Sequence, residues 1–494
     1  MRLSAGLDRF GWALAAITLV GALVRIRVAA TEPPHFDESY TALHYVQGSL
    51  GELLTTYDEP NNHILGSLLA WLSTGVLGGG PFALRLPALL AGIALVPAIG
   101  LLAWRMAPAR GTVSGLVAAT FVAGAPPLIV YSANARGYSV VLLLLVAQLA
   151  LTLRLGAPVG SGEGSRHPRA LWAWAGWVAC GALAIWTVPT ALLGIGIPVV
   201  WLAALRWRSA RSLVPVALAV VATAAACVLL YAPVLGDRGF DVDRFVAAPL
   251  KDLATTTAHA WAAGLAAPLL AAALLLALAG AARRPRLGTG APLTLGLLAV
   301  PLAIAVLGRM PPYSRTYLFL FVPLALLAGL GAARLAPALR RGGGGLAVGV
   351  GAAFGFVALL AGIGAQTREA WAEDPPGPSQ GDLASAVAAM PSPARAGTPG
   401  EVAVFVAPRF DLPQVQYVLT QRGLLGAPPL PRRAALGVGP VPVQGDVVVL
   451  TRAVVRPAEA VASAGLDPAA SEVVSATVRG DAQALVVRRR PPLP

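Results

Sequence analysis

Two adjacent acids, Asp37 and Glu38, follow the first apolar segment of the chain in the run His35-Phe-Asp-Glu-Ser-Tyr40. Ionised side chains beside a membrane are costly to place, so such a pair predicts a functional site. Arg136 lies between two later apolar segments, in the run Ser132-Ala-Asn-Ala-Arg-Gly-Tyr138. A carboxylate can accept a proton and a guanidinium can bind an anion, so the two runs could carry a reaction if they meet on one side of the membrane.

Two other interpretations of these residues stay open. Asp37 could be a solvated loop charge that caps a short helix beginning at Glu38. The acids and histidines of the same loop could also bind a divalent cation, because carboxylates and imidazoles are common metal ligands. We favour a site that works without a metal or another cofactor.

The composition is that of a polytopic membrane protein. Hydrophobic residues make up 56% of the 494 residues, charged residues only 12%, and the mean hydropathy is +0.71. A soluble chain would have about 25% charged residues. The net charge of +14 comes from dispersed arginines and not from one basic stripe, which excludes nucleic acid as an expected partner. Both cysteines, Cys180 and Cys227, fall inside apolar segments and indicate packing in the core.

A transmembrane helix needs about 20 apolar residues, and scanning at that length predicts about eleven spans. One long run between 171 and 206 is interrupted by Pro189, so it could form two helices or one kinked helix. The predicted spans are 11–30, 83–104, 112–130, 138–154, 171–187, 189–206, 213–232, 261–281, 291–308, 316–334 and 345–363.

Positive charge predicts the orientation. With a cytoplasmic N-terminus, most arginines fall in cytoplasmic connections, as the positive-inside rule requires. A cleavable signal peptide is the alternative for residues 1–30, but we expect a retained helix whose Arg25 and Arg27 extend to the outer interface. The richness in Ala, Gly, Arg and Pro suggests a bacterial source, so the expected location is the bacterial cytoplasmic membrane.

The external loop 31–82 is too long for a simple connection and is expected to be functional. Its apolar stretch 64–77 is too short to cross a bilayer and predicts an interfacial or re-entrant helix. The loop belongs to a transmembrane catalytic domain at 1–365.

A linker is predicted at 366–400 and a soluble extracytoplasmic α/β domain at 401–494. In that domain β-rich runs at 401–406, 446–450 and 484–488 alternate with helical patterns. The predicted helices are 413–422 and 456–465. The role of this domain is left open.

Several segments resemble those of GT-C membrane glycosyltransferases, in particular the protein O-mannosyltransferase and lipid A aminoarabinose transferase families (glycosyltransferase family 39-like). The similar segments follow the family's order over 1–335. They are Phe36-Asp-Glu-Ser-Tyr40, the Pro/Asn/His turn before 64–77, Ala83-Leu-Arg-Leu-Pro87, Tyr131-Ser-Ala-Asn-Ala-Arg-Gly-Tyr138, and Arg315-Thr-Tyr317 followed by Pro323. The chain departs at Ala133-Asn134, where the family often has Gln-Glu, and at Asn61-Asn62, where prolines are common.

The resemblance implies a GT-C fold and transfer of a sugar, with inversion, from a polyprenyl-phosphate carrier to an acceptor on the extracytoplasmic side. The acceptor would be a glycan, lipid or protein, and membrane lipids would surround the enzyme. Asp37 is then the candidate base, with Glu38 beside it to perturb its pKa or to orient the acceptor. The residues expected to bind substrate are Arg136 and, second, Arg315 for the phosphate, with Tyr138, Tyr317, Asp58, Glu59, Asn62 and His63 around them.

Two other functions are compatible with the sequence. A polytopic transporter or flippase would also place charges within the membrane. However, the halves of the chain show no internal repeat, and the suspect charges gather at one face. A metal-dependent transferase of whole oligosaccharides from a pyrophosphate carrier is the other alternative.

Overall fold

The computed structural model describes residues 2–57, 62–156, 168–207, 209–235, 293, 314–341, 380–390, 403–407, 412–424, 435–437 and 446–490. The chain divides into two compact units. The first comprises Met1–Ala30, Leu50–Ser73 and Arg85–Glu373, and the second comprises Thr31–Ser49, Thr74–Leu84 and Asp374–Pro494. The external loop therefore contributes to both units.

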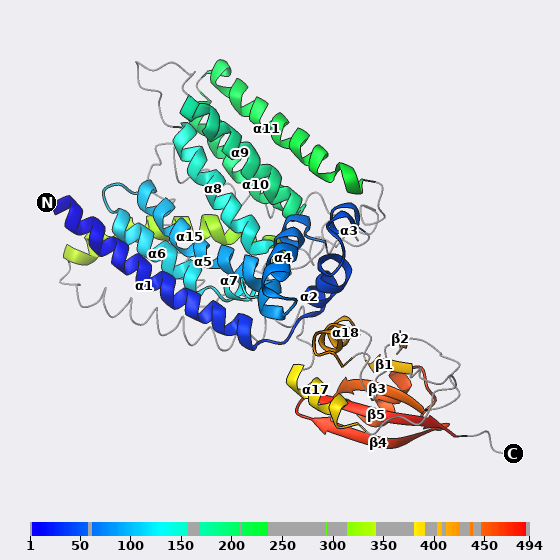
Figure 1. Ribbon diagram of the computed structural model, residues 1–494. Coiled ribbons are helices and arrows are strands. Elements are labelled where there is room, and N and C mark those ends of the chain that lie inside the picture. Colours follow the sequence, from blue (N-terminus) through cyan, green and yellow to red (C-terminus); the bar gives the residue numbers. More distant parts are fainter. Residues whose placement is uncertain are drawn as a thin grey trace, which may run out of the picture. The chain divides into compact units, whose positions relative to one another are not determined.

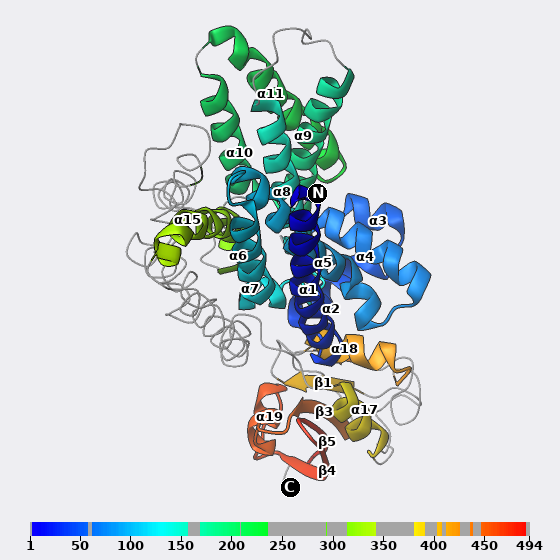
Figure 2. The same ribbon diagram turned by 90° about the vertical axis from the view of Figure 1, so that its left-hand side faces the viewer.

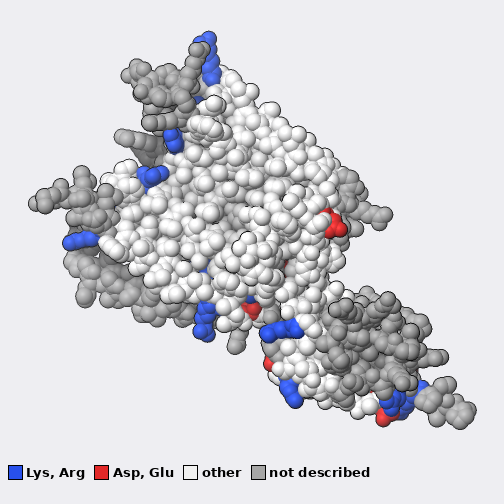
Figure 3. Space-filling view, in the orientation of Figure 1, with Lys and Arg blue, Asp and Glu red and all other residues white. Residues whose placement is uncertain are grey.

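The first unit is a bundle of apolar helices (Figure 1). Among the described residues, six helices are long and apolar enough to cross a membrane, and they make the chain an integral membrane protein. In Figure 3 the described surface over these helices is largely uncoloured, with Lys and Arg side chains toward its margins. The described helices and turns that lie wholly or mainly in this unit, long and short together, are α1 (Arg2–Thr31), α3 (Leu50–Thr55), α4 (Ile64–Leu77), α5 (Pro81–Met106), α6 (Gly111–Gly124), α7 (Pro126–Val130), α8 (Tyr138–Gly156), α9 (Pro168–Thr187), α10 (Ala191–Arg206), α11 (Ala210–Tyr231), the 3₁₀ turns η2 (Ala232–Val234) and η5 (Ser314–Leu320), and α15 (Phe321–Arg341).

Prolines set two of the breaks between helices. The run 171–206 forms two helices, α9 and α10, because Pro189 restricts the preceding residue and lacks an N–H. The predicted span 112–130 is wrong as one helix, since α6 stops at Gly124 and Ala125 turns extended before Pro126. The predicted short helix 64–77 is present as α4. The spans predicted at 261–281, 291–308 and 345–363 lie outside the described residues, apart from Leu293.

The prediction for Arg25 was also wrong. Its side chain is fully buried within the first unit, whereas Arg27, two residues farther along α1, is exposed. Arg25 donates hydrogen bonds to backbone carbonyls of α6 instead of extending to the interface.

The second unit is built on a five-stranded mixed sheet (Figure 2). Strand β1 is parallel to β2 and β3, and β5 is antiparallel to β3 and β4. The sheet order is β2 (Ala435–Gly437), β1 (Ala403–Ala407), β3 (Asp446–Arg452), β5 (Ala482–Arg489), β4 (Ser471–Arg479).

Helices cover both faces of this sheet, which explains why its central strands are continuous apolar runs. In β3, Val448 and Leu450 pack on one face with α17 (Gln380–Ala388) and α18 (Leu412–Gln421). The alternate residues Val447 and Val449 pack on the other face with α19 (Pro457–Ser463). The strands and helices predicted in 401–494 are thus present, while α17 forms inside the stretch predicted as linker.

The second unit also includes the beginning of the external loop. Helix α2 (Phe36–Thr41) continues into the π-helical turn η1 (Ala42–Val46), and both pack against α18. The Tyr417 hydroxyl of α18 donates a 3.1 Å hydrogen bond to the Gly79 carbonyl near the other end of the loop. Helix α18 therefore contacts the chain at both ends of the loop.

Candidate functional site

The run around Arg136 forms a buried turn between α7 and α8. All seven residues from 131 to 137 are buried, which is unusual for a loop because its backbone groups need partners away from water. A glycine is required at 137, since a Cβ there would come within 2.2 Å of Thr187 Cγ2 and 3.4 Å of His63 Cβ. This close approach brings His63, from the external loop, onto the turn.

His63 is held directly against the turn. The Gly137 N–H donates to His63 Nδ1 at 3.0 Å, and Arg136 Nη2 lies 3.3 Å from His63 Nε2. A neutral imidazole has one acceptor and one donor nitrogen, so the backbone bond to Nδ1 places the proton on Nε2. Arg136 and His63 then present two donors side by side.

Electrostatics keep this imidazole neutral. Burial, followed by the positive charges of Arg136 and Arg315, lowers the pKa of His63 well below 6.5. At neutral pH the site thus has positive charge from its arginines and a neutral N–H donor from His63. An anion whose oxygen bridges these two donors would accept from both.

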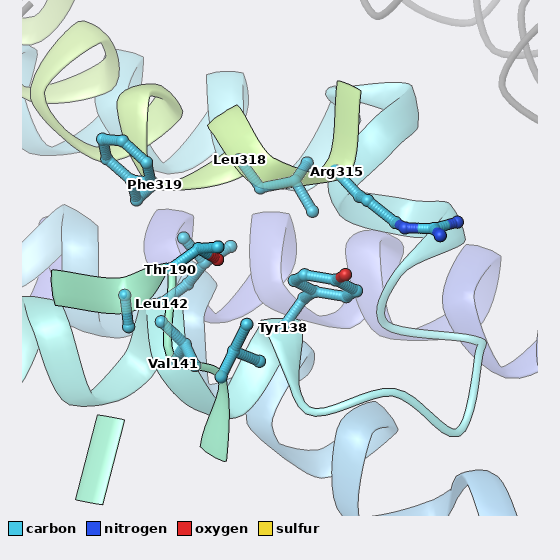
Figure 4. A pocket seen from close by; sticks show the side chains of 9 residues that line it. Tyr138, Val141, Leu142, Thr190, Arg315, Leu318 and Phe319 are labelled. Atoms are coloured by element: carbon cyan, nitrogen blue, oxygen red, sulfur yellow. The ribbon is translucent and has the colours of Figure 1, made fainter. Parts of the chain in front are cut away.

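Tyr138 and Arg315 extend the same cluster. The Tyr138 ring packs edge-on against His63 at 4.9 Å between centroids, and the Arg136 guanidinium lies 5.9 Å from its centre. Tyr138 and Arg315 also line a small cavity between the start of α8, the α9–α10 break and η5. In Figure 4 they lie near one another at one end of the cavity, whereas Phe319 lies toward the other end. The structure thus brings together Arg136, Tyr138, His63 and Arg315.

Tyr57 belongs to this cluster although the sequence analysis did not select it. Its ring is buried, and burial raises the pKa of Tyr57 to about 12, with the Arg136 charge opposing and Tyr138 reinforcing that shift. The phenol therefore keeps its proton at neutral pH and can donate. Tyr57 directly precedes Asp58 in the sequence, and no periodicity or motif around it distinguishes it from an interface tyrosine.

Asn62 is buried beside His63 and is engaged by the loop itself. Its Nδ2 donates to Thr56 O at 2.9 Å and Leu53 O at 3.4 Å, while Oδ1 accepts from Ser67 Oγ at 2.8 Å. These bonds join the end of α3 to the first turn of α4. The amide of Asn62 thus holds the segment that precedes His63, and its contact with substrate stays a prediction.

The acid pair lies on α2, in the second unit. Glu38 is buried and its Oε2 accepts the His35 N–H at 3.0 Å, which satisfies a buried backbone donor at the start of the helix. The helix begins at Phe36 with His35 as N-cap, so the suggestion that Asp37 caps it was wrong. Asp37 is half-buried one residue into the helix. Because the acids and Arg136 belong to different units, their meeting in one pocket stays a prediction.

The remaining predicted residues are not placed. Asp58 and Glu59 lie outside the described residues, and Tyr317 is described only as part of the η5 backbone. Within the described ranges, no group of three or more His, Cys, Asp or Glu side chains could hold a metal ion.

Comparisons with known proteins identify the fold. No protein-family model matches the sequence, and no curated protein matches it.

Among solved structures, ArnT from Cupriavidus metallidurans bound to undecaprenyl phosphate superposes with a TM-score of 0.58 at 14% identity, covering 98% of this chain and 99% of that one. The same enzyme in the apo state gives a TM-score of 0.58 at 14% identity, with 98% and 100% coverage. The archaeal oligosaccharyltransferase AglB from Archaeoglobus fulgidus gives 0.46 at 14% identity, with 89% and 69% coverage. Over nearly its whole length, the chain therefore has the GT-C fold of the ArnT structures.

Proposed function

We propose that this protein is an inverting glycosyltransferase that moves a sugar from a polyprenyl-phosphate donor to a hydroxyl acceptor on the extracytoplasmic face of the membrane. The observation that carries the proposal is the pair of donors formed by Arg136 and His63, 3.3 Å apart and buried together. An oxyanion that bridges two such donors from one side accepts a hydrogen bond from each.

A phosphate leaving group makes use of this arrangement. When the sugar carbon–oxygen bond breaks, the electron pair stays on the phosphate, whose charge rises from one to two negative units. The Arg136 guanidinium stabilises that growing charge, and the neutral His63 Nε2–H adds a donor without competing for a proton. Arg315, whose charge also reaches His63, is placed to assist.

We expect a prenyl chain to enter between the helices that border the small cavity beside these residues. The cavity lining is apolar along α8 and η5, with Val141, Leu142 and Leu318 among its residues, and its charged member is Arg315. A lipid phosphate would therefore keep its tail between helices while its headgroup meets the guanidinium groups. The fold shared with ArnT, whose structure was solved with undecaprenyl phosphate bound, supports this assignment.

The base in this reaction is Asp37. The acceptor oxygen attacks the anomeric carbon as the bond to phosphate breaks, and the acceptor proton passes to the Asp37 carboxylate. Glu38 holds the helix that carries this base through its bond to His35. This role requires α2 to face the site at Arg136, with the N-terminus and cytoplasmic arginines on the opposite side of a bacterial cytoplasmic membrane.

The proposal is tested with purified protein in liposomes supplied with radiolabelled polyprenyl-phosphate sugars and candidate glycan, lipid and protein acceptors. We expect label to enter an acceptor, and expect Asp37→Asn to abolish that transfer while binding of the donor persists. Movement of solute or lipid across the bilayer with no transfer would instead establish a transporter. Loss of transfer on chelation, restored by manganese, would establish a metal-dependent transferase.

A further inference from the structure

Two consecutive prolines leave two buried carbonyls of α6 without their usual partners. In a continuous helix, the carbonyls of Val122 and Ala123 would accept from the N–H groups of residues 126 and 127. Both of those residues are prolines, which have no N–H to donate. Unsatisfied carbonyls in an apolar interior are costly, so another donor is required.

Arg25 of α1 supplies those donors. Its Nη2 donates to Val122 O at 2.9 Å and its Nη1 donates to Ala123 O at 3.0 Å. Nη1 also lies 3.1 Å from Gly21 O in its own helix. The planar, multiply donating guanidinium suits this arrangement, whereas a lysine ammonium could not span the same acceptors.

The same guanidinium reaches the turn that carries Arg136. Arg25 Nε donates to Ser132 Oγ at 3.2 Å, and the Ser132 hydroxyl in turn donates to Leu128 O. Helix α5 makes room for Ser132 through Gly92, where a Cβ would come within 2.0 Å of Ser132 Oγ. Thus one buried side chain contacts both the end of α6 and the first residue of the run 132–137.

We propose that Arg25 is a positioning residue, which holds the Ser132–Gly137 turn so that Arg136 stays against His63 and ready for a phosphate. This inference rests on the proposed function, because it assigns Arg25 its effect through the Arg136 anion site. Arg25 could satisfy the Val122 and Ala123 carbonyls without contacting Ser132. Its further hydrogen bond to Ser132 Oγ is therefore the contact that couples α1 to the Ser132–Gly137 turn.

The experiment measures the affinity of undecaprenyl phosphate for the full-length protein in nanodiscs, for the wild type, Arg25→Met, Arg25→Lys and Ser132→Ala. Arg27→Met is the matched control, since Arg27 is on the same helix and exposed. We expect Arg25→Met to weaken binding about tenfold, the loss typical of one charge-assisted contact. Arg25→Lys should recover only part of that loss, Ser132→Ala should weaken binding less than Arg25→Met, and Arg27→Met should bind as the wild type does.

A double-mutant cycle with Arg136→Ala identifies the route of the effect. If Arg25 acts through Arg136, Arg25→Met should cause no further loss of affinity in the Arg136→Ala background. An equal loss in both backgrounds, or wild-type affinity in well-folded Arg25→Met and Ser132→Ala, would overturn the inference. If Arg25→Met does not fold, the cycle is run with Ser132→Ala, which leaves the carbonyl contacts of Arg25 intact.

The cycle also separates this inference from the proposed function. Wild-type affinity in Arg136→Ala would mean that the phosphate site itself is wrongly assigned. A large loss in Arg136→Ala with no change in the Arg25 and Ser132 variants would preserve the phosphate site and refute the positioning role.

Discussion

Arg136 Nη2 and His63 Nε2 lie 3.3 Å apart across 73 residues of sequence, and both belong to the helical unit of the chain. The Gly137 N–H occupies the other imidazole nitrogen, so the backbone of the Arg136 turn determines which nitrogen of His63 carries the proton. This arrangement links the external loop to the start of α8 and forms the proposed anion site.

Replacement of Arg136 should remove most transferase activity. Loss of a charge-assisted contact to the leaving phosphate costs about 2–4 kcal/mol in the transition state, a rate decrease of roughly 30- to 1,000-fold. Arg136→Lys should recover only part of this, because an ammonium cannot form a planar, bidentate contact. Turnover of labelled donor measures both variants, and a near-normal rate in folded Arg136→Ala would contradict the assignment.

The neutral state of His63 makes the free energy of unfolding depend on pH. The folded chain keeps the pKa of His63 well below 6.5, whereas in the unfolded chain the imidazole takes up a proton as the pH falls through 6.5. The unfolded state thus binds more protons, and the wild type should lose stability on acidification below pH 6.5. His63→Gln should lack this contribution, which thermal unfolding in detergent from pH 7.5 to 5.5 measures.

The pH dependence of the rate provides a separate check on His63. A residue that acts as a permanently neutral donor should produce no rate inflection near pH 6.5. His63→Gln, which offers an amide donor, should retain more activity than His63→Leu. An inflection near pH 6.5 that disappears in His63→Gln would show that the imidazole titrates in the working enzyme.

Glu38 should affect the structure of α2 through its hydrogen bond to the His35 N–H. Glu38→Gln preserves an acceptor and should leave both stability and turnover close to wild type. Glu38→Ala removes it and should lower the free energy of unfolding by about 0.5–2 kcal/mol. Thermal unfolding and turnover of the two variants compare these outcomes, and a severe rate loss in stable Glu38→Gln would indicate a direct role for the negative charge.

Asn62 should contribute mainly to the stability of the loop. Its amide makes hydrogen bonds to Thr56, Leu53 and Ser67, so Asn62→Ala leaves buried groups unpaired at a cost of about 1–3 kcal/mol. Ser67→Ala, which removes one of those bonds, is the matched control and should cost less. Thermal unfolding measures both, and a catalytic loss in Asn62→Ala with unchanged stability would favour contact with substrate instead.

Much of the fold follows from hydrophobic patterns in the sequence. Long apolar runs predicted α1, α5, α8 and α11, and the unbroken Val-rich runs predicted β1 and β3. Strand β4 was not predicted because it lies at the edge of the sheet and exposes most of its side chains, which leaves little apolar pattern to detect.

The candidate site was only partly predictable. Arg136, Tyr138 and His63 were selected by residue type and by resemblance to a family, but the contact between His63 and Gly137 depends on a close backbone approach that no periodicity encodes. Arg25 was misassigned because a charge near a helix end usually extends to the interface. The signal that could have identified its role was Pro126-Pro127, which removes two N–H donors.

The most direct test is an experimental structure of the full-length protein with a polyprenyl phosphate bound. We expect the phosphate oxygens within hydrogen-bond distance of the Arg136 guanidinium and His63 Nε2. We expect the prenyl chain to leave past Tyr138 and Arg315, and the Asp37 carboxylate to face the same phosphate. A headgroup bound away from Arg136, or Asp37 on the opposite side of the membrane from it, would contradict the proposed mechanism.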